Sequence, residues 1–302
     1  MPEDHLERPT VRPGSYSDGS PLDTVQYLEC KVILKPDRLT SLKALRDYGA
    51  IVQQAATRAG VGYSAQGLEN VRPAVREIRF YDTPDFRLYN NAFILRQRVR
   101  YEDGFPLGEP EIVFKFRHPD LQAAAEMDVR PKFDIRHRIK FKAEVLPLRE
   151  YVGGARVLYS HNAQFPLSEA PQVDRTSMVM LGRAFPCLEP LRESGTDRVD
   201  LVNQAIVEEV MLDLAVLDFG KGITAMANIA LWRMRGDHSP LVGEFAFQAR
   251  FKRADELHDK VIERCQHFFK LVQTLGEDMV MLGTTKTGAV YRCNGNAPQR
   301  HE

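Results

Sequence analysis

Charged and apolar side chains alternate along one segment, "IRHRIKFKAEV", at residues 135–145. Every second position is charged, in the order Arg136, Arg138, Lys140, Lys142 and Glu144. Side chains of a strand point alternately to its two faces, so one face carries four cations and a carboxylate. Cations this close repel one another unless an anion lies over them. The segment therefore indicates a strand that binds an anion, and a charged face turned to water is the alternative.

Three other segments repeat this alternation. They are "YLECK" with Tyr27, Glu29 and Lys31, "LRQRVRYE" with Arg96, Arg98, Arg100 and Glu102, and "VFKFR" with Lys115 and Arg117. A guanidinium presents a planar fork of donors that matches phosphate oxygens, so forks from several strands can hold a polyanion. A barrel of about eight strands would bring such faces together around a lumen wide enough for one small ligand.

Carboxylates on the same kind of face indicate a second role. Glu29 and Glu144 lie among cations, and Glu244 begins a face continued by Ala246 and Gln248. Oxygen ligands suit Mg²⁺ or Mn²⁺, which often bridge one or two carboxylates to substrate phosphates. An ion pair with a neighbouring lysine or arginine is the alternative for each glutamate taken singly.

The composition narrows the function classes. The chain has 302 residues and a formal net charge of zero, which argues against attachment to nucleic acid or membrane by bulk charge. No apolar run has the length of a membrane span, and residues 1–20 lack a secretory-type hydrophobic segment, so a cytoplasmic location is expected. The four cysteines are widely spaced and are expected to be free thiols.

The elements that must position these residues alternate with turns. We expect a disordered leader at 1–22 and then one domain at 23–302. It should hold a helix within 39–60, capped by Thr40 or Ser41 and stopped by Gly60, and another at about 254–275. Strands are expected at 25–34, 75–82, 92–103, 111–117, 134–145, 206–220, 223–235 and 240–251. Residues 147–201 form an insert whose structure the pattern does not resolve. The order favours an α+β fold with an antiparallel, eight-stranded, tunnel-like barrel flanked by helices.

The chain resembles the CYTH superfamily, the triphosphate tunnel metalloenzymes. "YLECK" is similar to the E-x-E-x-K strand of that family, and "RFYDTPDFRLYNNAFILRQRVR" looks like its YDTP-type turn followed by an arginine strand. Two positions depart from the family pattern: Tyr27 replaces the first glutamate, and Ala246 replaces the second late acid. A phenol cannot replace a carboxylate as a ligand of Mg²⁺ at neutral pH.

The resemblance implies a divalent-metal-dependent phosphohydrolase that acts on an inorganic or organic triphosphate, with adenylyl cyclase activity as a related possibility. Glu29 and Lys31 are the candidate catalytic residues, and Glu29, Glu144 and Glu244 are the candidate ligands of Mg²⁺ or Mn²⁺. The candidate substrate-binding residues are Lys31, Arg96, Arg98, Lys115, Arg117, Arg138, Lys140 and Lys142. The alternative is a non-catalytic module that binds polyphosphate or a nucleotide through a degenerate metal site.

A few further residues have two interpretations each. Glu208, Glu209 and Asp218 could add acidic ligands, although Asp218 equally suits a turn with Gly220. Trp232 could stack on a base, but buried packing is expected. Lys286 could reach a phosphate, but an exposed surface position is expected.

Overall fold

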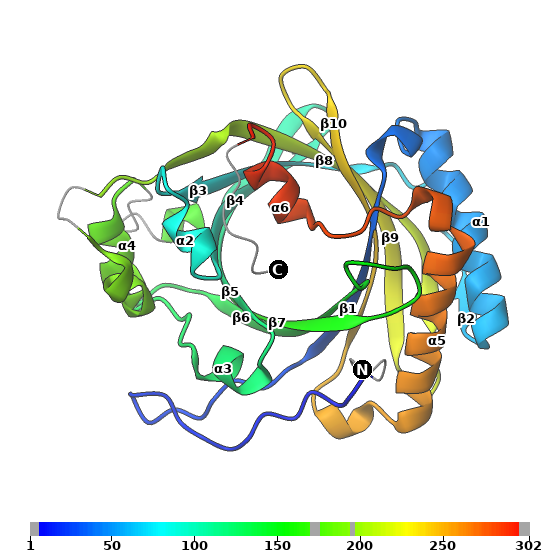
Figure 1. The fold of residues 1–302 in the computed structure, drawn as a ribbon, viewed down its shortest axis with the longest axis horizontal. Helices are drawn as coiled ribbons and strands as arrows, with labels where there is room; N and C mark the ends of the chain where they lie inside the picture. Colours follow the sequence, from blue (N-terminus) through cyan, green and yellow to red (C-terminus); the bar gives the residue numbers. More distant parts are fainter. Residues whose placement is uncertain (1–5, 170–175, 194–196, 296–302) are drawn as a thin grey trace.

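The structure, a computed structural model, describes residues 6–169, 176–193 and 197–295. Its strands are β1 (Tyr27–Leu34), β2 (Gly62–Ser64), β3 (Ala74–Asp82), β4 (Phe93–Glu102), β5 (Phe105–His118), β6 (Arg138–Leu146), β7 (Arg156–Pro166), β8 (Asp200–Asp218), β9 (Thr224–Met234) and β10 (Pro240–Arg250). Nine of them form a closed ring in the order β8-β3-β4-β5-β7-β6-β1-β10-β9, because β9 pairs again with β8 (Figure 1). The short strand β2 pairs with the end of β8, outside the ring.

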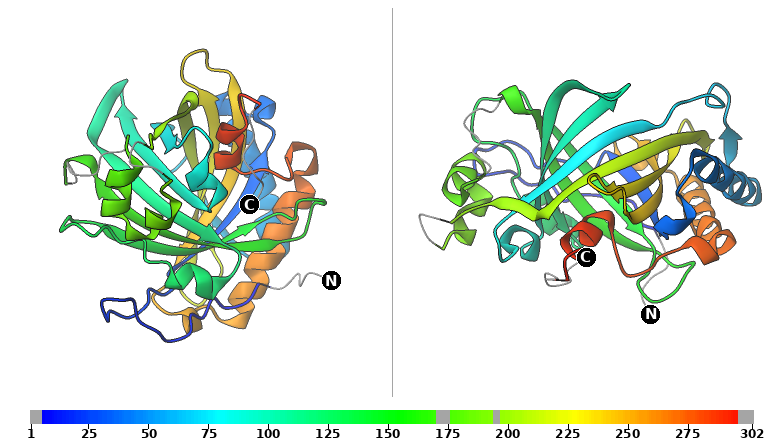
Figure 2. Two further views of the ribbon diagram at one scale, coloured as in Figure 1. Left: turned by 60° about the vertical axis from the view of Figure 1, so that its left-hand side comes forward. Right: turned by 90° about the horizontal axis from the view of Figure 1, so that it is seen from above.

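Helices cover the outer face of the ring and one of its openings. They are α1 (Leu42–Ala59), α2 (Arg87–Asn90), α3 (Leu121–Glu126), α4 (Met178–Ala184), α5 (Asp259–Leu275) and α6 (Lys286–Tyr291). The two long helices, α1 and α5, lie side by side against one wall, and α4 lies on the opposite side (Figures 1 and 2). The short helix α6 lies across one opening of the ring (Figure 1). No helix in the described part of the chain is long and apolar enough to span a membrane.

The expected tunnel-like α+β barrel is confirmed, but two of its details are wrong. The ring has nine strands instead of eight. The insert at 147–201, to which the sequence pattern assigns no structure, contributes β7 between β5 and β6. One pair is parallel, β1 with β6, and the other neighbours in the ring are antiparallel. Ser160, Asn162 and Gln164, at every second position of β7, carry no charge, and Arg156 is the only Lys, Arg, Asp or Glu of the strand, so the alternation of charge that marks the other strands is weak here.

The apolar faces of the strands point outward into a core beneath the helices. Cys30 and Val32 of β1 are fully buried there, as are Val52 of α1 and Phe268 of α5. Phe268 packs edge-on against Phe247, with ring centres 5.1 Å apart. The barrel therefore buries its apolar side outside and leaves its charged side to the lumen, which is the arrangement that the alternation predicts.

The first helix ends where its sequence predicts. The Ser41 side chain accepts a hydrogen bond from the Ala44 amide at 3.0 Å, as an N-cap does. Gly60 follows the last turn at φ 64°, a left-handed conformation that only glycine adopts at no steric cost. These two residues fix the length of α1 against the barrel wall.

Of the expected leader, residues 6–22 contact other parts of the chain, including α5 and α3, and residues 1–5 lie outside the described part. Leu6 is buried, and the Arg8 Nε donates to the Leu257 carbonyl at 2.8 Å. Just beyond, Asp23 lies 3.1 Å from Nε2 of the buried His161 on β7. A few apolar and polar anchors suffice to hold this segment, although its composition resembles that of a disordered chain.

The insert at 147–201 covers the wall opposite α1 and α5. Met178 and Leu181 of α4, followed by Phe185, pack on the outward-facing phenylalanine side chains of β5 and β7. Phe185 stacks on Phe114 with ring centres 4.0 Å apart. The insert therefore supplies both a strand of the barrel and its apolar cover.

Candidate functional site

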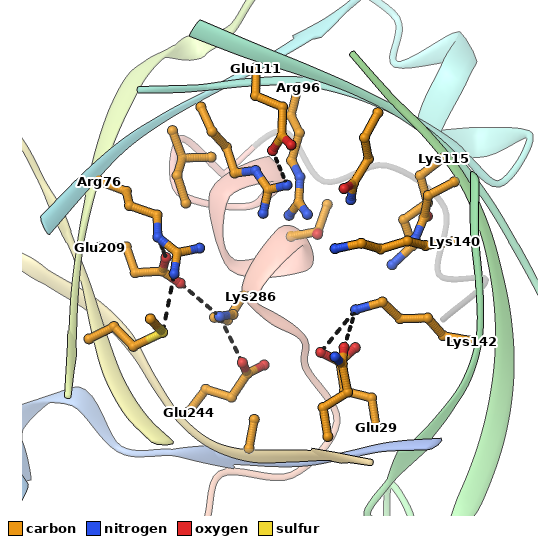
Figure 3. Close-up of a pocket in the computed structure, with 18 of the residues that line it drawn as sticks. Glu29, Arg76, Arg96, Glu111, Lys115, Lys140, Lys142, Glu209, Glu244 and Lys286 are labelled. Carbon is orange, nitrogen blue, oxygen red and sulfur yellow. Dashed lines mark hydrogen bonds and ion pairs between the residues drawn. The ribbon is translucent and has the colours of Figure 1, made fainter. Parts of the chain in front are cut away.

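The ring encloses a cavity of about 1020 Å³ that is lined mainly by charged side chains (Figure 3). Twelve cations line it: Lys31, Arg76, Arg96, Arg98, Arg100, Lys115, Arg117, Arg136, Arg138, Lys140, Lys142 and Lys286. Six carboxylates line it: Glu29, Glu109, Glu111, Glu144, Glu209 and Glu244. The lumen thus has a formal charge of +6 in a chain whose net charge is zero.

All eight predicted substrate-binding residues lie on the wall of this cavity. Their positions follow from alternation: residues of like parity on β4, β5 and β6 face the lumen, while Phe114, Phe116 and Phe141 face outward into the core. With Lys31 of β1, the structure therefore brings together cations from four strands that are far apart in the sequence. Their role in binding stays a prediction.

Glu29 and Glu144 lie together because their Cα atoms are register partners on β1 and β6. The Lys31 ammonium bridges them, 2.8 Å from the Glu29 Oε2 and 3.0 Å from the Glu144 Oε1. Lys142 lies 3.2 Å from the other Glu29 oxygen and donates to the Gln248 amide oxygen at 2.7 Å. Two carboxylates are held here by two ammonium groups, and the group is positive once Lys115 and Arg117, which also contact Glu144, are included.

Glu144 is the most buried of the lumen carboxylates, with a side chain 2% exposed. Besides Lys31, the Lys115 ammonium lies 2.9 Å from its Oε1, and the Arg117 Nε lies 3.1 Å from its Oε2. Burial alone would raise the pKa of Glu144, but Lys115, Lys31 and Arg117 outweigh burial and hold it well below its ordinary value. Glu144 is therefore a charged anchor for the surrounding cations.

Glu244 lies in a different group, which the sequence did not reveal. The Lys286 ammonium of α6 lies 2.7 Å from the Glu244 Oε1 and 3.1 Å from the Glu209 Oε1 (Figure 3). The Trp232 indole N–H donates to the same Glu209 oxygen at 2.8 Å, and Lys286 lies over the Trp232 ring. The expected surface position of Lys286 is therefore wrong. No strand alternation marks Lys286, because it enters the ring from a C-terminal helix.

The structure also decides between the two interpretations given for Trp232, Glu208 and Asp218. The Trp232 side chain is buried in the core, as expected. The Glu208 carboxylate pairs with Arg233 instead of joining Glu209 in the lumen. The Asp218 side chain accepts from the Gly220 amide at 2.8 Å, so it stabilises the turn.

Arg96 and Lys140 form no ion pair with a carboxylate in the described part of the chain. The Arg96 Nε is buried and has no hydrogen-bond partner there. Burial, and then the nearby Arg98, lowers the pKa of Arg96 to about 10. Burial, followed by Lys142 and Arg138, lowers the pKa of Lys140 to about 8. At these two positions, burial and neighbouring cations disfavour the charged form, and a bound anion would offset both effects.

The predicted metal ligands do not form one site with this arrangement of side chains. Glu29 and Glu144 are together, but Glu244 belongs to the Lys286 group, and no cluster of three or more His, Cys, Asp or Glu suited to a metal occurs among the described residues. The oxygens have the right chemistry for Mg²⁺, yet ammonium groups already occupy them. These residues therefore do not fit a divalent ion held by the protein alone.

Comparisons with known proteins are distant. No protein-family model and no curated protein matches the sequence. Among solved structures, similarity is found to an adenylyl cyclase candidate from Hippeastrum that is described as having a dominant triphosphatase activity. It is 11% identical with a TM-score of 0.41, over 89% of this chain and 96% of that chain.

Two further structures are similar over comparable lengths. An adenylate cyclase candidate from Bacillus halodurans is 9% identical with a TM-score of 0.36, over 87% of this chain and 96% of that chain. The protein PH1819 from Pyrococcus horikoshii is 14% identical with a TM-score of 0.32, over 85% of this chain and 92% of that chain. Because these similarities are weak, the barrel is defined by its strand pairing and the site by its own side chains, without support from the neighbours.

We expect Glu144→Gln to lower the free energy of unfolding by about 3–5 kcal/mol, because it leaves several buried cations without their counter-charge. Urea denaturation followed by circular dichroism measures this change. Glu102→Gln is the matched control: Glu102 is exposed on β4, and its replacement should change the stability by less than about 0.5 kcal/mol. Equal stability of the two variants would contradict the anchoring role of Glu144.

Proposed function

We propose that the lumen binds a triphosphate-bearing small molecule or an inorganic polyphosphate. The observation that carries this proposal is the buried Arg96 Nε, which has no hydrogen-bond partner in the described structure. A buried donor of a charged group is costly unless something accepts from it. A phosphate oxygen supplies both the acceptor and the missing negative charge.

The distribution of charge supports a ligand with several anionic groups. Cations reach the lumen from β1, β3, β4, β5, β6 and α6, so they surround the cavity (Figure 3). The carboxylates offset only half of them, which leaves the lumen at +6. A chain of phosphates can contact several walls at once, and each contact joins a charged donor to a charged acceptor.

Removal of Arg96 tests the proposal most directly. We expect Arg96→Met to weaken the binding of tripolyphosphate by about 10- to 100-fold, the effect of losing one charge-assisted hydrogen bond. Isothermal titration calorimetry at low salt measures the affinity, which should fall as salt is added. Arg46→Met on the outer surface of α1 is the control and should bind as the wild type does. Equal affinity of the two variants for tripolyphosphate would contradict the proposal that Arg96 binds the anion.

Binding should also depend on pH through Lys140. A bound phosphate favours the charged ammonium and raises its pKa above the value of about 8 in the free protein. Below pH 8 both states hold the proton, so this contribution to affinity is complete. As pH rises from 8 toward the pKa of the complex, binding must take up a proton, and the affinity falls by up to about tenfold per pH unit.

Calorimetry at pH 8.5 in buffers of different ionisation enthalpy measures this uptake. Lys140→Arg keeps the charge at that pH, and we expect it to bind the same ligand with a smaller proton uptake than the wild type. Proton uptake that is unchanged in this variant would show that Lys140 is not the linked group.

Hydrolysis of the bound anion is the second candidate function. It is favoured by the position of Glu29, whose carboxylate lies in the lumen beside Lys31 and Lys142. Phosphoryl transfer depends mainly on positioning and charge neutralisation, and a carboxylate next to the phosphate-binding cations can orient a water molecule.

Phosphate release from tripolyphosphate, ATP and thiamine triphosphate, each with Mg²⁺, Mn²⁺ or EDTA, tests this second function. If the lumen hydrolyses any of them, Glu29→Gln should lower kcat by about 100-fold or more, since it removes the water-orienting group. Retained tripolyphosphate binding in this variant separates the two functions. Binding without phosphate release under every condition would leave only the binding module.

A further inference from the structure

Two lysines of the lumen each join two carboxylates, and the first is Lys31. Its ammonium lies between Glu29 and Glu144, at 2.8 and 3.0 Å, and the side chain is only 14% exposed. Burial acts to lower the pKa of Lys31, but Glu144 and Glu29 outweigh it and raise the pKa above its ordinary value. The bridging group therefore stays a cation, and it joins carboxylates from two neighbouring strands.

The second lysine, Lys286, repeats this arrangement at another part of the wall. It lies between Glu244 of β10 and Glu209 of β8, at 2.7 and 3.1 Å. Both glutamate side chains are 6% exposed, and Trp232 fixes Glu209 through its indole N–H. In each group, an ammonium stands where a divalent cation would join two carboxylates.

The surroundings of these groups disfavour an additional cation. The Tyr27 ring, at the position where the resemblance leads one to expect a carboxylate, lies 5.8 Å from the Lys142 ammonium, 6.0 Å from that of Lys140 and 5.8 Å from the Arg250 guanidinium carbon. It adds aromatic contact for cations and no anionic ligand. A free dication would therefore enter a lumen of net charge +6 and would have to displace an ammonium that the chain holds in place.

We propose that Lys31 and Lys286 take the place of divalent metal ions, so that the polyanion binds to the lumen without Mg²⁺ or Mn²⁺. This inference rests on the proposed binding function. Mg²⁺ loses its water reluctantly and needs several oxygens, whereas each lysine reaches its two carboxylates without any further ligand. The two lysines keep the carboxylates neutralised, and Arg96 and Lys140 remain available to the anion.

Calorimetric titration of tripolyphosphate into the full chain, in EDTA and in millimolar Mg²⁺, gives opposite results for the two alternatives. We expect equal or weaker binding with Mg²⁺, because Mg²⁺ neutralises the anion in solution and the protein offers it no site. Binding at least tenfold tighter with Mg²⁺ would overturn the inference and leave the proposed function standing. No binding in either buffer would overturn the proposed function itself.

A Mn²⁺ titration without phosphate, followed by the electron paramagnetic resonance signal of free Mn²⁺, tests the place of Lys286. We expect no specific binding to the wild type and at least tenfold tighter binding to Lys286→Met, in which Glu209 and Glu244 lose the ammonium that joins them and only Arg76 still pairs with Glu209. Lys43→Met, at an exposed site on α1, is the charge-matched control and should behave as the wild type does.

Mn²⁺ should also raise the melting temperature of Lys286→Met and not that of the wild type, which keeps the test valid if the variant is less stable. Tight binding of Mn²⁺ to the wild type would overturn the inference, and this result does not depend on how the variant folds. A folded Lys286→Met that gains no Mn²⁺ binding would equally overturn the assignment of Lys286 to a cation position.

Discussion

An excess of positive charge enclosed by a closed ring of strands is the constraint on which the rest of this structure depends. In an open sheet, a charged face can turn to water, but in a closed ring every second side chain must enter the lumen. Twelve cations and six carboxylates meet there. Ion pairs with Glu29, Glu144, Glu209 and Glu244 neutralise part of this charge and give the cations fixed positions. The remainder is available to a ligand.

The same alternation decides what lies outside the barrel. Because the charged side chains point inward, the apolar side chains point outward and need a cover that water does not provide. The helices α1 and α5 supply it on one wall, where Phe268 packs on Phe247. The insert supplies it on another, where Phe185 packs on Phe114. The helices thus serve mainly to bury the outer face, and their burial holds the strands that carry the lumen charges.

Much of this arrangement could be predicted because charged residues stand at every second position of several strands. Residues such as Arg96, Lys115 and Lys142 could be assigned to one face, and a polyanion follows from their type. The partners of each carboxylate could not be predicted, because they come from other strands and depend on register. Glu209 gave only a weak signal as one of two adjacent acids, and Lys286 gave none, since it reaches the lumen from a helix. The strand β7 was missed because Ser160, Asn162 and Gln164 on its polar side carry no charge.

The placement of β1 has a consequence for the order in which the barrel can form. This strand pairs in parallel with β6 and antiparallel with β10, so both its neighbours come from much later in the chain. The ring cannot close until β10 has been synthesised, and pairings this distant in sequence form slowly. Until then the charged sides of β1 and β6 remain hydrated, and their mutual repulsion is weakened by water. Closure of the last seam is the step at which the barrel removes these charges from water, and an anion present at that moment would favour the closed form over the open one.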